Sequence, residues 1–99
     1  IGSRRGESAA LNSLGRLHHA QARPQQALAC LDEALAIQRE LQLRPQMVRT
    51  LDALADVQAA TGDPAAAARS RQEARTLAQA LGMPDDRAGR PAAAGSRPG

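Results

Sequence analysis

A chain of 99 residues forms one small domain at most, and because it has no Phe, Trp or Tyr, its core has to be built from aliphatic side chains and alanine. The absence of aromatic rings counts against single-stranded nucleic-acid binding, which generally stacks bases on such rings. The formal net charge is only +3, and the arginines alternate with Asp and Glu along the chain, which favours a solvated surface of mixed charge over a nucleic-acid patch.

Two helices are expected in the first part of the chain, after residues 1–7, which we interpret as the end of a preceding repeat or a linker. The first helix, at about 8–20, carries a face of side chains spaced by three or four residues: Leu11, Leu14, Leu17 and His18. Pro24 suits the first position of a helix, where its missing N–H costs nothing, and it opens a second helix at about 24–41. Together these helices form a first repeat over residues 8–44.

The second part of the chain repeats this pattern over residues 45–82, with helices expected at about 46–60 and 64–81. Residues 62–64 combine a glycine that can end one helix, an aspartate that can cap the next and a proline that suits its first position. This is the strongest local turn signal in the sequence. Beyond this repeat, residues 83–99 carry no periodic apolar face, and we expect a disordered tail.

An internal period of forty residues relates the two parts without a gap. Identical residues in this register include Leu11 and Leu51, Leu14 and Leu54, Ala20 and Ala60, Pro24 and Pro64, Ala27 and Ala67, Glu33 and Glu73, Ala34 and Ala74, and Leu41 and Leu81. The register predicts two copies of one helical hairpin.

The spacing of small and large residues resembles the tetratricopeptide repeat signature. The first repeat matches it with Leu14-Gly15, His18, Ala27, Leu31 and Ala34. The second places Leu54-Ala55, Gln58, Ala67, Arg71 and Ala74 at the same offsets. The resemblance implies an all-α, tetratricopeptide-like α-α superhelix of stacked antiparallel helical hairpins, here two repeats plus the tail. It also implies a surface for protein binding and not a reaction.

Some positions depart from that signature, since His18 and Gln58 replace the usual tyrosine and Arg71 replaces a large apolar residue. The period of forty exceeds the usual thirty-four. It looks like the variant of kinesin-light-chain-like arrays and of sensor arrays in bacterial ATPase-type transcriptional regulators, whose repeats often open as residues 4–15 do here. An arginine at 71 requires water, so we expect the helix at 64–81 to end the array and the chain to be the C-terminal part of a larger protein.

In this family, partners usually bind the concave surface, which is formed by the first helix of each repeat. By register, that surface presents Asn12, Arg16, His19, Arg49, Asp52 and Asp56. The functional interpretation is a polar groove in which an Asn amide forms hydrogen bonds with a peptide backbone and arginines bind carboxylates. The alternative is that Arg49, Asp52 and Asp56 only form exposed intrahelical pairs, worth about 0.3–0.5 kcal/mol each.

Other kinds of site find little support. Adjacent histidines such as His18 and His19 point about 100° apart on a helix and cannot share one ion, so no metal and no cofactor are expected. His18 is expected in the inter-helix tyrosine slot, and Cys30, the only cysteine, as a small buried residue. No nucleophile motif or phosphate loop is present in the sequence, so we expect no enzyme. No apolar run is long enough to span a membrane, and a cytoplasmic location is the default.

Three functions follow, in order of preference. The first is a protein-protein interaction scaffold that docks a peptide or a neighbouring domain of the parent chain, in one version the sensor part of a bacterial transcriptional regulator. The second is a purely structural capping segment, or a homodimer formed through the exposed edge of the first helix, because two hairpins are fewer than the three or so repeats usually needed for stability. The third and weakest is nucleic-acid contact through arginines, namely Arg23, Arg69, Arg71 and Arg75.

Overall fold

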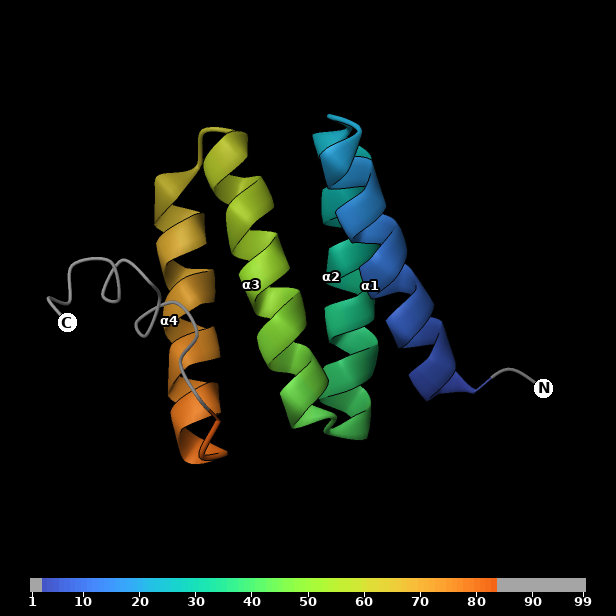
Figure 1. Cartoon of the computed structure of the whole chain (residues 1–99), viewed down its shortest axis with the longest axis vertical. Coiled ribbons are helices and arrows are strands. Elements are labelled where there is room, and N and C mark those ends of the chain that lie inside the picture. Colours follow the sequence, from blue (N-terminus) through green and yellow to red (C-terminus); the bar gives the residue numbers. More distant parts are fainter. Residues whose placement is uncertain (1–2, 84–99) are drawn as a thin grey trace, which may run out of the picture.

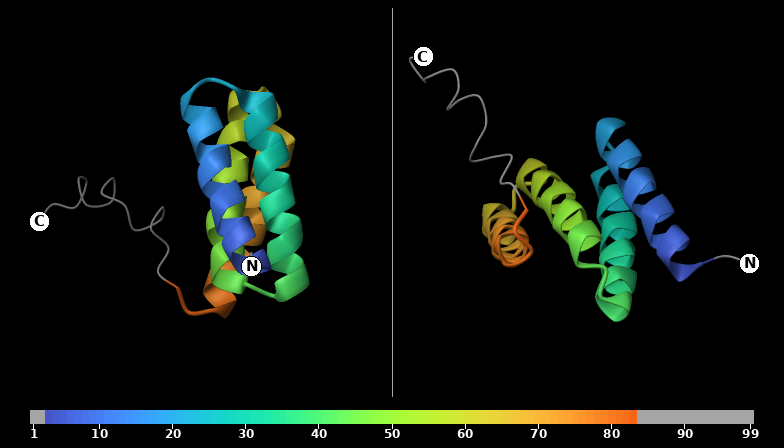
Figure 2. Two further views of the ribbon diagram at one scale, coloured as in Figure 1. Left: turned by 90° about the vertical axis from the view of Figure 1, so that its right-hand side faces the viewer. Right: turned by 60° about the horizontal axis from the view of Figure 1, so that its bottom comes forward.

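A computed structural model describes residues 3–83 as four helices joined by tight turns. The helices are α1 (Arg4–Ala20), α2 (Pro24–Leu41), α3 (Arg44–Ala60) and α4 (Pro64–Ala80). Figure 1 shows them running alternately up and down, and Figure 2 shows that they follow one another across the molecule in chain order. The expected all-α fold of helical hairpins is therefore confirmed, while the tail predicted at 84–99 lies outside the described residues.

The helices stack as two hairpins and not as a bundle around one axis. The pair α1 and α2 and the pair α3 and α4 make the most extensive contacts, and α2 packs against α3 to join the hairpins. Within residues 3–83, the backbones of α1 and α4 do not come together. This arrangement leaves the outer side of α1 and one side of α4 without a neighbouring helix.

Side-chain caps begin two of the helices, and the sequence predicted one of them. Ser3 accepts a hydrogen bond from the Gly6 amide at 3.0 Å, so α1 begins at Arg4, four residues before the predicted start at 8. The equivalent helix α3 begins at Arg44, two residues before the prediction of 46. At α4 the expected cap is present, because Asp63 Oδ1 accepts from the Ala66 amide at 3.0 Å.

In α2 the core follows the face that the periodicity predicts, but in α1 the prediction is wrong for Leu14 and Leu17, which keep 43% and 51% of their surface exposed because no other helix of residues 3–83 packs on that side. Ten buried side chains form one cluster through α2, α3 and α4: Ala27, Leu31, Leu35, Met47, Val48, Leu51, Leu54, Val57, Ala74 and Ala78. Small residues let the helices approach closely. A Cβ on Gly15 would lie 2.7 Å from Leu31 Cγ, so only glycine fits where α1 crosses α2.

Two polar links tie the first hairpin to the second. Between the first helices, Asn12 Nδ2 of α1 donates to Thr50 Oγ1 of α3 at 2.6 Å. Between the second helices, Arg39 of α2 donates to both carboxylate oxygens of Glu73 in α4, at 2.6 and 3.1 Å. This bidentate hydrogen bonding lowers the pKa of Glu73. One link therefore joins α1 to α3 and the other joins α2 to α4.

Candidate functional site

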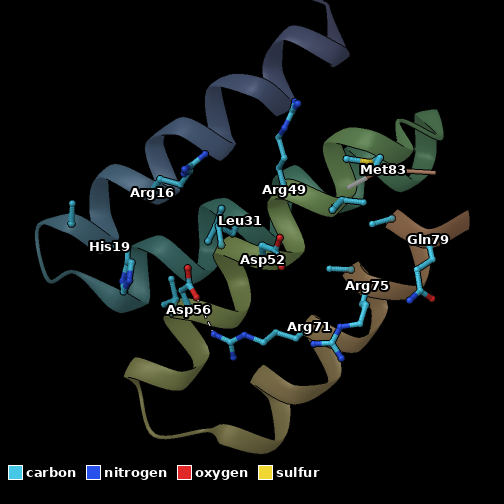
Figure 3. Close-up of a pocket in the computed structure, with 16 residues that line it drawn as sticks. Arg16, His19, Leu31, Arg49, Asp52, Asp56, Arg71, Arg75, Gln79 and Met83 are labelled. Carbon is cyan, nitrogen blue, oxygen red and sulfur yellow. Dashed lines mark hydrogen bonds and ion pairs between the residues drawn. The ribbon is translucent and has the colours of Figure 1, made fainter. Parts of the chain in front are cut away.

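A groove with a volume of ≈ 640 Å³ opens between α1, α3 and α4 (Figure 3). Its apolar lining comes from buried core residues, among them Leu31, Val48, Val57 and Ala74. Polar and charged side chains line the remainder: Arg16, His19, Arg49, Asp52, Asp56, Arg71, Arg75 and Gln79. The groove thus combines an apolar base with ionic groups supplied by three helices.

Five of the six side chains predicted for the concave surface line this groove. Arg16 and His19 come from α1, and Arg49, Asp52 and Asp56 come from α3. They meet because α1 and α3 are the first helices of the two repeats and expose the same side, as the forty-residue register implies. Figure 3 shows these residues on facing stretches of the two helices. What each of them contacts in a partner stays a prediction.

Asn12 is the sixth predicted residue, and it lies beside the groove instead of lining it. Its side chain is half-buried, and its Nδ2 donates to the hydroxyl of Thr50, which is fully buried. The sequence predicted a ligand contact for this amide. The structure gives it an internal contact between the two repeats.

The contribution of α4 to the groove was not predicted. Arg71, Arg75 and Gln79 line it from α4, and Met83 lines it from just after that helix. In the forty-residue register, Arg71 and Arg75 correspond to Leu31 and Leu35, which are buried between α2 and α3. Because both leucines are replaced by arginine, the sequence could have predicted that this side of α4 faces a polar groove and not another helix.

The groove carries more positive than negative charge. Four guanidinium groups stand against the carboxylates of Asp52 and Asp56. Arg71 Nη2 lies 3.0 Å from Asp56 Oδ1, and both side chains keep about a third or more of their surface exposed (31% and 43%). Two carboxylates can neutralise two of the four arginines one to one, so the groove keeps an excess of two positive charges.

A comparison with protein-family models found that residues 6–80 match the tetratricopeptide repeat model. That match covers both hairpins and the groove between them. The chain belongs to the tetratricopeptide repeat family. Searches among curated proteins and among solved structures found no match.

As a tetratricopeptide repeat protein, the chain is a protein-protein interaction scaffold. The repeat signature explains the packing between the helices of each hairpin, where Gly15 meets Leu31 and where Ala55 and Ala74 are buried in the second repeat. Gln58, in the slot of the usual tyrosine, accepts a hydrogen bond from Ser70 Oγ at 2.7 Å and so ties α3 to α4. The first of the two repeats has His18 in this slot, half-buried.

Residues 3–83 contain no group of three or more His, Cys, Asp or Glu side chains placed to hold a metal ion. Within the same residues, no helix has the length and apolar composition required to cross a membrane. Cys30 was predicted to be buried and is half-buried on α2.

Proposed function

We propose that the groove between α1, α3 and α4 docks an acidic, extended segment of a partner protein. The observation that supports this proposal is the charge excess in the groove, four arginines against two aspartates, above an apolar base. Carboxylates are the protein groups that guanidinium binds best, because two parallel N–H donors match two oxygens.

Each helix of the groove has a part in this proposal. Arg16 from α1, Arg49 from α3 and Arg75 from α4 approach the ligand from three sides. Asp56 holds Arg71 through its ion pair and so fixes one side of the groove. The apolar base accepts an aliphatic or aromatic side chain of the ligand, since the groove's own residues include no Phe, Tyr or Trp to fill it.

Binding of a short fluorescein-labelled Glu-rich peptide tests the proposal by fluorescence anisotropy, with its Lys-rich counterpart alongside. The Glu-rich peptide should bind, and the Lys-rich peptide should not. Because at least one charge-assisted hydrogen bond is lost, the double variant Arg16→Gln, Arg49→Gln should weaken binding about tenfold or more. Affinity should also fall as ionic strength rises from about 0.05 to 0.3 M.

The matched control is the double variant Arg23→Gln, Arg69→Gln, which removes the same charge from exposed positions outside the groove. It should leave the peptide affinity within about twofold, apart from long-range screening effects. Equal losses in both double variants would contradict a specific groove. A DNA oligonucleotide that bound as tightly as the Glu-rich peptide would instead support the arginine-mediated nucleic-acid function.

The same leucine-to-arginine exchange supports a place for α4 in the parent array. A further repeat would bury its first helix against Arg71 and Arg75, as α3 buries Leu31 and Leu35 of α2. We therefore propose that α4 is the last helix of the array. A further repeat encoded directly downstream would refute this.

The sensor role in a bacterial transcriptional regulator and the cytoplasmic location stay predictions from the resemblance and from composition. The reading frame upstream of Ile1 tests the first: more repeats followed by a nucleotide-binding or DNA-binding domain would support it, and their absence would remove it.

A further inference from the structure

The outer side of α1 exposes leucines at positions that are buried in the second repeat. Leu14 and Leu17 lie about one turn apart on this side and keep 43% and 51% of their surface in solvent. Figure 1 shows α1 at the edge of the stack, with its other side against α2. In the forty-residue register, the two leucines correspond to Leu54 and Val57 of α3, which are only 2% and 0% exposed. The same positions are therefore covered in one repeat and open in the other.

The second helix of the first repeat covers these positions on α3. Leu31 and Leu35 of α2 are buried in one cluster with Leu54 and Val57, and α2 packs against α3. Because Leu31 and Leu35 are four residues apart, they lie on the same face of α2. A helix with two large aliphatic residues at this spacing is thus the group that fits over such positions.

A carboxylate on α2 lacks the ionic partner that its equivalent on α4 has. Glu33 corresponds to Glu73 in the register, and Glu73 accepts two hydrogen bonds from Arg39, which lies on the second helix of the repeat before it. Glu33 is exposed, and among residues 3–83 its carboxylate has no ion pair and no hydrogen bond. The first repeat therefore lacks both contacts, apolar and ionic, that α2 gives to the second repeat.

The last helix of a second copy would fit this surface poorly. The contacts of α2 come from Leu31, Leu35 and Arg39, and the same positions of α4 hold Arg71, Arg75 and Gln79. Head-to-tail stacking of two copies would therefore bury guanidinium groups against leucines and leave Glu33 without a cation.

The forty-residue register also continues to the first residue of the sequence. Ile1 stands at the position of Leu41, the last residue of α2, and of Leu81, the cap residue of α4. A large aliphatic residue thus recurs three times at the position where a second helix ends. This recurrence indicates that the register belongs to an array in which a second helix precedes α1.

We propose that the outer side of α1, together with Glu33 of α2, docks the second helix of a preceding repeat of a longer chain. That helix carries large aliphatic residues forty positions before Leu31 and Leu35, and these cover Leu14 and Leu17. It carries a basic residue forty positions before Arg39, and this residue binds Glu33. The docking helix therefore has two aliphatic residues four positions apart and a basic residue four positions further on.

The groove takes no part in this contact. Arg16, which lines the groove, lies on another side of α1 from Leu14 and Leu17, since successive helical residues turn by about 100°. The docked helix and the acidic ligand therefore occupy different surfaces, and neither contact depends on the other.

The encoded sequence upstream of Ile1 gives the first test. At the three positions forty residues before Leu31, Leu35 and Arg39, it should encode two large aliphatic residues and a basic residue, within a stretch of helical periodicity. A polar or charged residue at either aliphatic position would overturn the proposal. An acidic residue at the third position, or a reading frame too short to encode a helix, would do the same.

An extended protein tests the surface itself. A copy of residues 3–40 is joined directly to Ile1 of the full 99-residue chain, so that Ile1 takes the place of Leu41 and the added repeat is in register. With Cys30→Ser in both repeats, Leu14→Cys on the original α1 is labelled with a maleimide. Labelling should be at least about tenfold slower in the extended protein than in the 99-residue chain, because a buried thiol reacts only through local opening.

Ala9→Cys is the matched control for labelling. Ala9 is exposed, and so is Arg49 at the equivalent position of the covered helix α3, so this thiol should react at the same rate in both proteins. Circular dichroism of each variant checks that the helices remain. Equal labelling rates for Leu14→Cys in the two proteins would overturn the proposal.

Glu33→Gln on the original α2 tests the ionic contact separately. The substitution should leave the Tm of the 99-residue chain unchanged, because Glu33 has no ion pair within residues 3–83. In the extended protein it should lower Tm by about as much as Glu73→Gln does, since each variant then loses an ion pair with an Arg39 side chain. A fall in the 99-residue chain, or no fall in the extended protein where Glu73→Gln causes one, would contradict the contact with Glu33.

Light scattering of the 99-residue chain examines the second copy as an occupant. A dimer in which Leu14→Cys is as protected as in the extended protein would overturn the proposal, because a second copy would then cover the outer side of α1. None of these measurements uses the Glu-rich peptide, so a failure of peptide binding and a failure of helix docking are distinguished.

Discussion

Replacing Gly15 by alanine tests the closest helix contact in the structure. In an exposed helix, glycine to alanine stabilises by about 1 kcal/mol. At this position the new Cβ would lie 2.7 and 2.8 Å from Leu31 Cγ and Cδ2 and 3.3 Å from the Ala27 carbonyl oxygen. Leu31 is fully buried and has little freedom to move, and overpacking of this kind costs about 1–3 kcal/mol.

We therefore expect Gly15→Ala to lower the free energy of unfolding by about 1 kcal/mol, which corresponds to a fall in Tm of about 4–8 °C for a domain of this size. Urea unfolding followed by circular dichroism at helix wavelengths measures it. Leu31→Ala alone should cost about 2–5 kcal/mol. In that background the two contacts with the Leu31 side chain are gone and only the 3.3 Å contact with the Ala27 carbonyl oxygen remains, so Gly15→Ala should change sign and stabilise by up to about 1 kcal/mol.

The second repeat provides the control for this reasoning. Ala55 is fully buried at the position equivalent to Gly15, and Arg71 stands where Leu31 stands in the first repeat. Because a methyl group already fits there, Ala55→Gly should destabilise through lost helix propensity and lost burial. A stabilising Gly15→Ala in the wild-type chain would refute the argument, because it would mean that Leu31 moves aside at no cost.

Two further predictions concern the turn and the ion pair between the second helices. Ala22, in the turn after α1, has the left-handed conformation (φ 59°) at the position where the second repeat has Gly62 (φ 84°). Ala22→Gly should therefore raise Tm by relieving about 1 kcal/mol of strain, and an unchanged or lower Tm would contradict this. The hydrogen bonds from Arg39 lower the pKa of Glu73. The ionised carboxylate of Glu73 therefore adds to the free energy of unfolding at pH values above its unfolded-state pKa, and this stabilisation is lost as the pH falls through its folded-state pKa. Glu73→Gln should cost at most about 1 kcal/mol at pH 7, because both side chains are more than 40% exposed. The difference from wild type should shrink as the pH falls below the unfolded-state pKa of about 4.3 and disappear once Glu73 is protonated in the folded state; a difference that persisted then would show that the loss is not ionic.

The sequence predicts the fold well because one forty-residue register is repeated twice with the same small residues at the helix crossings. It predicts five groove residues for the same reason, since a register that places helices also places their faces. Asn12 was predicted to contact a ligand because the sequence shows on which face of the helix a residue lies, but not which other helix packs against that face. Its partner Thr50 is 38 positions away, and only the packing of α1 near α3 brings them together.

From the sequence, Arg71 was expected to face water at the end of the array, and α4 was not expected to line the groove. The structure adds that Arg71 turns toward Asp56 and that Arg75 lies nearby on the same helix. The start of α1 was also placed too late. Ser3 caps the helix, whereas Ser8 is buried inside it and donates to the Arg5 carbonyl oxygen at 2.9 Å.

The two polar links between the hairpins, Asn12 to Thr50 and Arg39 to Glu73, have a kinetic consequence. One holds α1 to α3 and the other holds α2 to α4, so together they resist both opening and closing of the angle between repeats. Each link contributes only about 1 kcal/mol, so the links restrain the width of the groove without fixing it, and a ligand that binds there would lose less conformational entropy than in a groove without them. Binding of the acidic peptide should therefore follow a single exponential phase. Its observed rate constant should rise linearly with protein concentration, without the plateau that a slow rearrangement of the groove would impose.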